Sequence, residues 1–140
     1  MSFFTGYALA EQKTPAPGAT GLNSDIYALA QDVVGKLFDS YRYYARDSFE
    51  KVVSSDMAGR PEFISQVEKD YFSATDMEMN FFAEDALSKD NTLAVKVKWE
   101  KKAQPYNANT PVMSKGACEL TFKKTGGSWL LYQVSGDNPF

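Results

Sequence analysis

The spacing of apolar residues changes from a helical period to a period of two near Thr75, and this change constrains the fold more than any other feature of the sequence. Before it, apolar side chains from Ile26 to Tyr44 recur at helical spacing. After it, apolar residues from Met77 to Ala83 alternate with polar ones, as in a strand with one buried face. The order predicts an α+β domain, in which N-terminal helices pack on a curved antiparallel sheet of about four to six strands.

Three helices are expected before the change of period. Ser24 is a suitable N-cap for a long amphipathic helix. Asp47, followed three residues later by Glu50, has the spacing of a capping box and predicts a short second helix. Gly59 and Pro61 then mark the end of that segment and the first turn of a third helix.

Four strands are expected after the change of period, at about 77–84, 93–100, 116–123 and 129–134. The polar segment from Lys101 to Lys115 is interpreted as a long excursion between strands, whose ends could pair. The strand from Trp129 to Val134 is apolar on both faces, which is typical of a central strand or of a subunit interface. We therefore expect a homodimer through the outer face of the sheet.

Composition excludes several classes of function. The chain has 140 residues, a formal charge of -3 and no histidine, and 140 residues are enough for one core. Because acidic residues slightly outnumber basic ones, the chain has no basic surface of the kind that binds nucleic acid. No stretch approaches the roughly 20 apolar residues that span a bilayer. Without histidine the chain lacks the most common metal ligand and neutral-pH base, so neither a metal nor a cofactor is expected. The single cysteine, Cys118, is interpreted as a buried structural thiol.

Residues 1–23 are assigned to an N-terminal arm or signal remnant followed by a linker, and residues 24–140 to the folded domain. Ala8-Leu9-Ala10 follows an apolar piece in the small-x-small pattern of a signal-peptide cleavage site. The alternative is an apolar arm that packs on the domain. The pattern slightly favours an exported or periplasmic location over the cytoplasm.

Five short segments stand out in the two halves of the chain: Phe38-Asp39-Ser40-Tyr41, Asp47 to Val53, Leu120-Thr121-Phe122, Gly126 to Leu131 and Val134-Ser135-Gly136. They resemble the nuclear transport factor 2-like superfamily, which has a cystatin-like cone and includes the SnoaL-like proteins. The ending from Gly136 to Phe140 is similar to that of uncharacterised bacterial members, many of them exported. The resemblance implies a sheet wrapped around the first helix, with a pocket between sheet and helices.

The inward strand positions are apolar, which predicts a non-enzymatic binding domain for a small apolar molecule or a protein partner. The residues expected to line the pocket are Tyr41, Tyr44, Val67, Phe81, Val97, Trp99, Phe122 and Trp129. The same aromatic residues could instead simply fill the core.

The alternative function is a lyase- or isomerase-like enzyme, with a helix or loop carboxylate such as Asp39 or Asp76 and a tyrosine such as Tyr41. The resemblance implies that enzymes of the ketosteroid isomerase type have a tyrosine on the first helix, which Tyr41 or Tyr44 could match. They also have acids on the strands, at positions where this chain has apolar residues. Lys96, Lys98, Lys101 and Lys102 form a basic stripe that could meet an anionic partner. Alternation explains the first two as a wetted strand face.

Overall fold

The computed structural model describes residues 20–140, with side chains from Ser24 onward. The expected N-terminal arm and its cleavage pattern lie outside the described residues. Within residues 20–140, no helix is long and apolar enough to cross a membrane.

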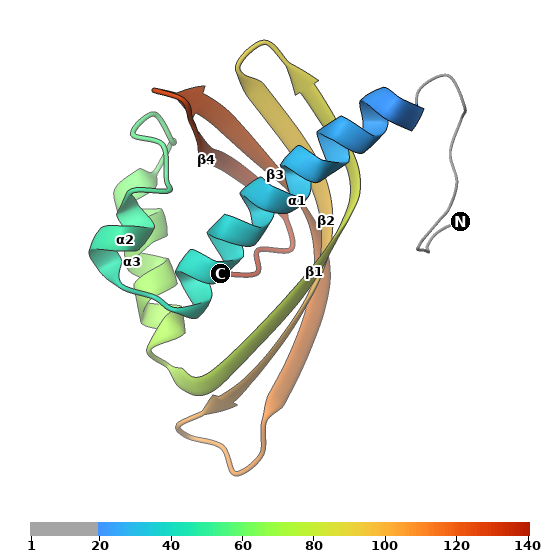
Figure 1. Cartoon of the computed structure of the whole chain (residues 1–140). Coiled ribbons are helices and arrows are strands. Elements are labelled where there is room, and N and C mark those ends of the chain that lie inside the picture. Colours follow the sequence, from blue (N-terminus) through green and yellow to red (C-terminus); the bar gives the residue numbers. More distant parts are fainter. Residues whose placement is uncertain (1–19) are drawn as a thin grey trace.

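Three helices precede a four-stranded antiparallel sheet, as the sequence predicts. The elements are α1 (Thr20–Arg42), α2 (Arg46–Glu50), α3 (Arg60–Tyr71), β1 (Ala74–Lys89), β2 (Thr92–Pro105), β3 (Val112–Thr125) and β4 (Ser128–Gly136). The strands pair in sequence order, and each pair is antiparallel. Figure 1 shows α1 crossing one face of the curved sheet, with α2 and α3 beside it.

Two predicted helix starts are wrong. Helix α1 begins at Thr20, before the expected cap at Ser24, so the helix extends into the segment assigned to the linker. Helix α2 has Ala45 at its N-cap with no side-chain cap, and Asp47 lies inside its first turn instead. A carboxylate there still stabilises the helix, because it faces the positive end of the helix dipole. The third start is confirmed, with Gly59 in the left-handed region and Pro61 in the first turn.

The strands extend beyond their predicted limits, and the predicted excursion from 101 to 115 is mostly strand. Lys101 pairs with Ser114 and Ala103 pairs with Val112, so only residues 106–111 connect β2 to β3. Alternation did not predict these strand ends, because most of their residues are polar or exposed and no regular apolar face runs through them.

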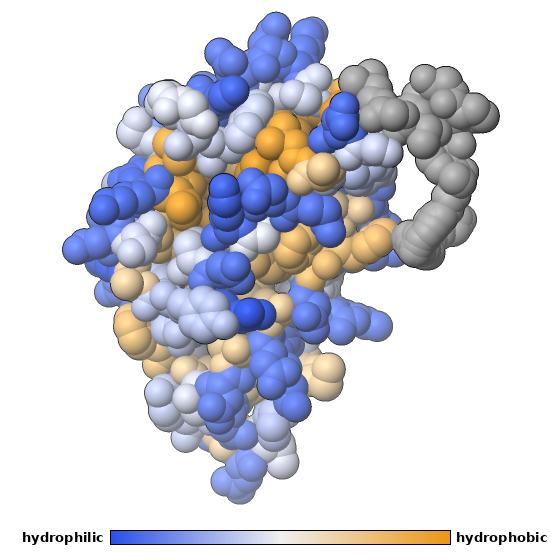
Figure 2. Space-filling view, viewed as in Figure 1, coloured by the Kyte–Doolittle hydropathy of each residue, from blue (hydrophilic) through white to orange (hydrophobic). Residues whose placement is uncertain are grey.

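The core lies between α1 and the inner face of the sheet. Ala30, Val34 and Tyr41 present one face of α1 and are 0% exposed. Leu93, Val95, Val97 and Trp99 alternate along β2 and meet Leu120 and Phe122 of β3 in the same apolar cluster. On the viewed face, exposed apolar surface gathers in patches beside α1 among polar residues (Figure 2).

Strand β4 lies at the edge of the sheet, and its apolar residues have several partners. Leu131 is fully buried and forms a parallel bridge with Val53. The ammonium groups of Lys123 and Lys124 lie 4.1 Å from the Tyr132 ring and 5.8 Å from the Trp129 ring. These contacts account for apolar residues on both faces within a single chain.

Candidate functional site

After β4 the chain turns back across the sheet toward the interior. Gly136 has a φ of 89°, and a Cβ atom there would lie 2.8 Å from the carbonyl oxygen of Ala117. The next residue is tied to β3 twice: Asp137 donates its backbone N–H to the oxygen of Ala117 at 2.9 Å, and its carboxylate accepts from the N–H of Ala117 at 3.1 Å. We call residues 137–140 the closing segment.

The path of the closing segment is fixed by close contacts with β2 and β3. The indole N–H of Trp99 donates to the carbonyl oxygen of Asp137 at 2.8 Å. A Cβ atom on Gly116 would lie 2.6 Å from the Cβ of Asp137 and 2.8 Å from the Cζ2 of Trp99. Glycine at this position therefore allows the closing segment to pack directly against the strand.

The Phe140 ring occupies the interior that the sequence predicts as a pocket. This residue is 3% exposed, and its ring centroid lies 5.3 to 6.4 Å from those of Phe38, Tyr41, Phe49 and Phe63. We call these four residues the aromatic cage. All four contacts have the edge-to-face geometry favoured by aromatic pairs. In Figure 1 the chain after β4 runs to the end marked C beside the C-terminal part of α1.

Three ionisable side chains meet beside the cage, and we call them the mouth cluster. The hydroxyl of Tyr41 donates to the carboxylate of Asp70 at 2.8 Å. The ammonium of Lys101 donates to the same carboxylate oxygen at 3.0 Å, to the Tyr41 hydroxyl at 3.2 Å and to the Pro139 carbonyl at 2.9 Å. On α3, the amide of Gln66 donates to the Phe140 carbonyl at 3.0 Å.

Burial and neighbouring carboxylates keep the two predicted pocket tyrosines protonated. Burial, and then Asp70, raises the pKa of Tyr41 well above its usual value. Burial, and then the hydrogen bond to Glu68, raises the pKa of Tyr44 to about 12. Neither phenol can therefore supply a base near neutral pH, and the Tyr41 proton is held by Asp70.

The structure places the eight predicted pocket residues in the core cluster or against it. Tyr41, Val67, Val97, Trp99 and Phe122 are buried, and Tyr44, Phe81 and Trp129 are partly buried. Tyr41 and Tyr44 both contact the ring of Tyr71, and Phe81 contacts Phe38. Trp129 lies far from Trp99 along the sheet. It pairs with Lys124 at one end of β3, whereas Trp99 pairs with Gly116 at the other end.

The carboxylates named for the alternative enzyme lie elsewhere. Asp39 is exposed on α1 and lies 3.9 Å from Arg42, and Asp76 is exposed near the start of β1. The carboxylate beside Tyr41 belongs to Asp70 instead.

Sequence reasoning missed Asp70, Lys101, Gln66 and Phe140. A signal for Lys101 was present, since Leu93, Val95, Val97, Trp99 and Lys101 follow one another at alternate positions. Continuing that period places Lys101 on the inner face, where its side chain is 16% exposed. Phe140 had no such signal, because its burial depends on the turn at Gly136.

Cys118 lies on the inner face of β3 near the closing segment. It is buried, and burial followed by the charge of Asp137 raises the pKa of its thiol to about 11. A thiol of this kind is a poor nucleophile near neutral pH. Among residues 20–140, no group of three or more Cys, Asp or Glu side chains is arranged to hold a metal ion.

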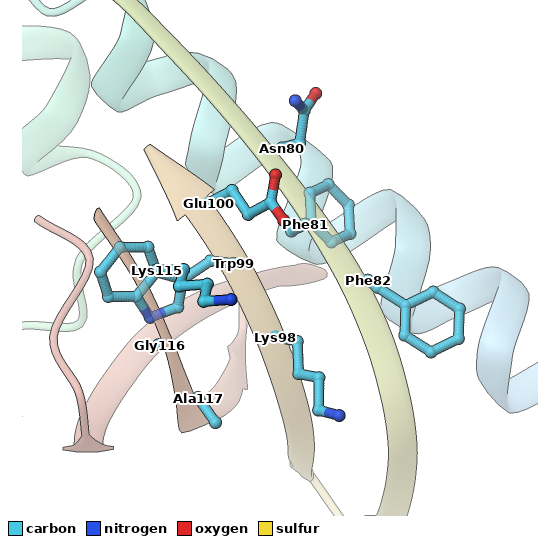
Figure 3. Close-up of a pocket in the computed structure, with 9 residues that line it drawn as sticks. All are labelled: Asn80, Phe81, Phe82, Lys98, Trp99, Glu100, Lys115, Gly116 and Ala117. Atoms are coloured by element: carbon cyan, nitrogen blue, oxygen red, sulfur yellow. The ribbon is translucent and has the colours of Figure 1, made fainter. Parts of the chain in front are cut away.

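Apart from the aromatic cage, a hollow of about 740 Å³ lies across β1, β2 and β3. Cross-strand pairing places Phe82, Lys98 and Ala117 in one row of its floor, and Asn80, Glu100 and Lys115 in the next. Figure 3 shows the lining residues, among them Phe81, whose ring centroid lies 5.1 Å from that of Phe38 on α1. We call this groove the outer groove. Phe81, Trp99 and Gly116 also line it, but none of the four residues of the aromatic cage does.

Comparisons with known proteins give the fold. No family model and no curated protein matches the chain. A conserved protein from Planctomyces limnophilus is similar in structure, with 15% identity and a TM-score of 0.67 over 86% of this chain and 99% of that one. A candidate dehydratase of the nuclear transport factor 2-like family from Streptomyces avermitilis has 8% identity and a TM-score of 0.68, over 80% and 95% of the two chains.

A nuclear transport factor 2-like superfamily protein from Salmonella enterica has 10% identity and a TM-score of 0.65, over 84% of this chain and 93% of that one. The predicted resemblance is thereby confirmed as a likeness of fold. Since similar folds include both a candidate dehydratase and proteins of unknown function, fold alone does not assign an activity.

Proposed function

We propose that this chain is a non-catalytic binding domain, whose cone accepts the aromatic group of a small apolar molecule in the position of the Phe140 ring. The observation that carries the proposal is the aromatic cage, in which four rings surround one phenyl group. Binding sites for small molecules are commonly apolar and aromatic, with a few polar groups that orient the ligand. The mouth cluster and Gln66 supply such groups here.

The pairing inside the mouth cluster argues against acid-base catalysis. The ammonium of Lys101 has three donors and three oxygen acceptors, and the carboxylate of Asp70 accepts from both Lys101 and Tyr41. A catalytic base needs a lone pair directed at a substrate proton. The arrangement supports holding a molecule rather than transforming it.

Phe140 acts in this proposal as an internal competitor. A group attached to the same chain has an effective concentration in the millimolar range, so an external ligand must displace it at a cost in affinity. Removing the ring should therefore strengthen binding of an external aromatic molecule.

The test is a titration with toluene, followed by the amide and indole N–H signals in NMR spectra. We expect weak, saturable binding to the wild type, and binding at least about tenfold tighter to Phe140→Ala, because removing a competitor restores the intrinsic affinity. Phe122→Ala is the matched control, since it removes the same ring from another fully packed position. Equal gains in both variants would show only that a cavity binds toluene, and the proposal would be wrong.

A lyase- or isomerase-like enzyme is the second candidate, and the 2.8 Å contact between Tyr41 and Asp70 favours it. Such reactions begin with removal of a proton next to a carbonyl. If this candidate is correct, the wild type exchanges the α-protons of simple ketones for deuterium faster than buffer does, and Asp70→Asn abolishes the excess. Equal rates in wild type, variant and buffer would eliminate it.

Homodimerisation is a separate structural proposal. Face-to-face packing of two copies would cover the outer groove, whose Phe82 and Ala117 supply apolar contact. It would also bury the Lys98–Glu84 ion pair, 3.2 Å in length, although interface centres are usually depleted of charge. Light scattering at high concentration tests it, and a monomer mass would contradict it.

A further inference from the structure

We infer that the ligand of the cone carries, beside its aromatic ring, two neighbouring carbonyl-type acceptors, as an N-acylated aromatic amino acid amide does. This inference rests on the proposed function and names the class of ligand. It follows from what the closing segment presents to the protein: one phenyl ring, with a carbonyl on each side of the carbon that bears it.

The first acceptor position is set by Lys101. Its side chain is 16% exposed, so each of its donors requires an oxygen partner. Two donors go to Asp70 and Tyr41, which belong to the protein wall. The third goes to the Pro139 carbonyl at 2.9 Å, and a ligand that displaces the segment must replace that oxygen.

The second acceptor position is set by Gln66 on α3, whose amide donates to the Phe140 carbonyl at 3.0 Å. Gln66 is exposed, so this acceptor lies at the mouth of the cone, with the ring inside. The two donors therefore come from two different elements, β2 and α3, and meet consecutive carbonyls of one short segment.

The charge of Lys101 indicates that the first acceptor is neutral. Asp70 lies 3.0 Å from the ammonium and already balances it. A second carboxylate beside Asp70 would face a like charge, which is unfavourable at short range. A neutral carbonyl, as in Pro139, satisfies the donor without that cost.

The closing segment can make way for such a ligand once its ring is removed. Its ring is the part buried in the cage, and Gly136 at its base has the conformational freedom of glycine. In Phe140→Ala the segment loses its apolar anchor, so its hydrogen bonds to Lys101 and Gln66 hold it less firmly. A molecule with both ring and carbonyls can then displace the segment and take over both hydrogen bonds.

The experiment uses the full chain carrying Phe140→Ala and three ligands that differ in acceptors. N-acetyl-L-phenylalaninamide has two acceptors, N-acetylphenethylamine has one, and ethylbenzene has none. Binding is followed by the Trp99 indole N–H signal, which reports on the Asp137 carbonyl it contacts. Phe140→Leu, which keeps an apolar anchor, serves as a second background if Phe140→Ala does not fold.

We expect affinity to rise with each acceptor, by roughly three- to tenfold for the one that meets Gln66 and by roughly tenfold or more for the one that meets charged Lys101. In Gln66→Leu, N-acetyl-L-phenylalaninamide and N-acetylphenethylamine should bind alike. If ethylbenzene binds as tightly as the amide, the ligand class is wrong while apolar binding stands. If none of the three binds to either folded variant, the proposed function itself fails.

Discussion

Substituting Gly116 by alanine tests whether the closing segment is packed as tightly as the contacts indicate. The new Cβ would lie 2.6 Å from the Cβ of Asp137, 2.8 Å from the Cζ2 of Trp99 and 2.9 Å from the Oδ2 of Asp137. Trp99 is 7% exposed and its indole is hydrogen-bonded to Asp137, so neither neighbour can move without breaking that bond. Overpacking of this kind costs about 1 to 3 kcal/mol of unfolding free energy.

Gly35→Ala is the matched control. Gly35 lies inside α1, and a Cβ there would meet only the Cζ of Phe81, at an ordinary 3.9 Å. Alanine stabilises a helix interior by about 0.5 to 1 kcal/mol relative to glycine. The same added methyl group should therefore raise the free energy of unfolding in Gly35→Ala and lower it in Gly116→Ala.

The assay is urea unfolding at 25 °C, followed by far-UV circular dichroism. Because the steric conflict of Gly116→Ala acts through the closing segment, its cost should shrink when Phe140→Ala has already loosened that segment, with a coupling above about 0.5 kcal/mol. A Gly116→Ala variant as stable as the wild type would refute the tight packing. Full additivity with Phe140→Ala would refute the link to the ring.

Three further outcomes are expected. In the folded protein the pKa of Tyr44 is about 12, above its ordinary value of 10, so the folded state binds more protons than the unfolded state between pH 10 and pH 12. The contribution of Tyr44 to the free energy of unfolding should therefore be fully present below pH 10 and be lost toward pH 12. Over this range the urea midpoint should fall less in Tyr44→Phe than in the wild type. Lys101→Met should lower the free energy of unfolding by only about 1 to 2 kcal/mol, because the Asp70 side chain is 40% exposed and solvent screens the ion pair. A double-mutant cycle with Asp70→Asn, measured by urea unfolding, should show that the two substitutions are coupled. The Cys118 thiol, with a pKa of about 11, should resist a disulfide reagent at pH 8 until urea unfolds the chain; rapid labelling of the native protein would contradict its burial.

The architecture was predictable because each element buries a periodic face. The alternation from Leu93 to Trp99 fixed the inner face of β2, and the helical spacing from Ile26 to Tyr41 fixed the buried face of α1. The ends of the strands were not predictable in this way. Residues 112–115 are exposed, and their partners at 101–105 are mostly polar, so no apolar period marks this part of the hairpin.

The candidate site was predicted in part. Tyr41 lies beside the Phe140 ring, and Trp99 fixes the path of the closing segment. That these residues line a binding pocket stays a prediction. Asp70, Gln66 and Phe140 come from α3 and from the segment after β4, and only the turn at Gly136 brings them together. Such contacts depend on tertiary geometry, which spacing along one element does not encode.

The most direct test of the central claim is the location of a bound aromatic molecule. Toluene in deuterated wild-type protein with protonated phenylalanine rings would give intermolecular nuclear Overhauser effects to whichever rings surround it. We expect contacts to Phe49 and Phe63 of the cage, together with a shift of the Phe140 amide signal. Contacts to Phe82 in the outer groove, with the Phe140 signal unchanged, would contradict it.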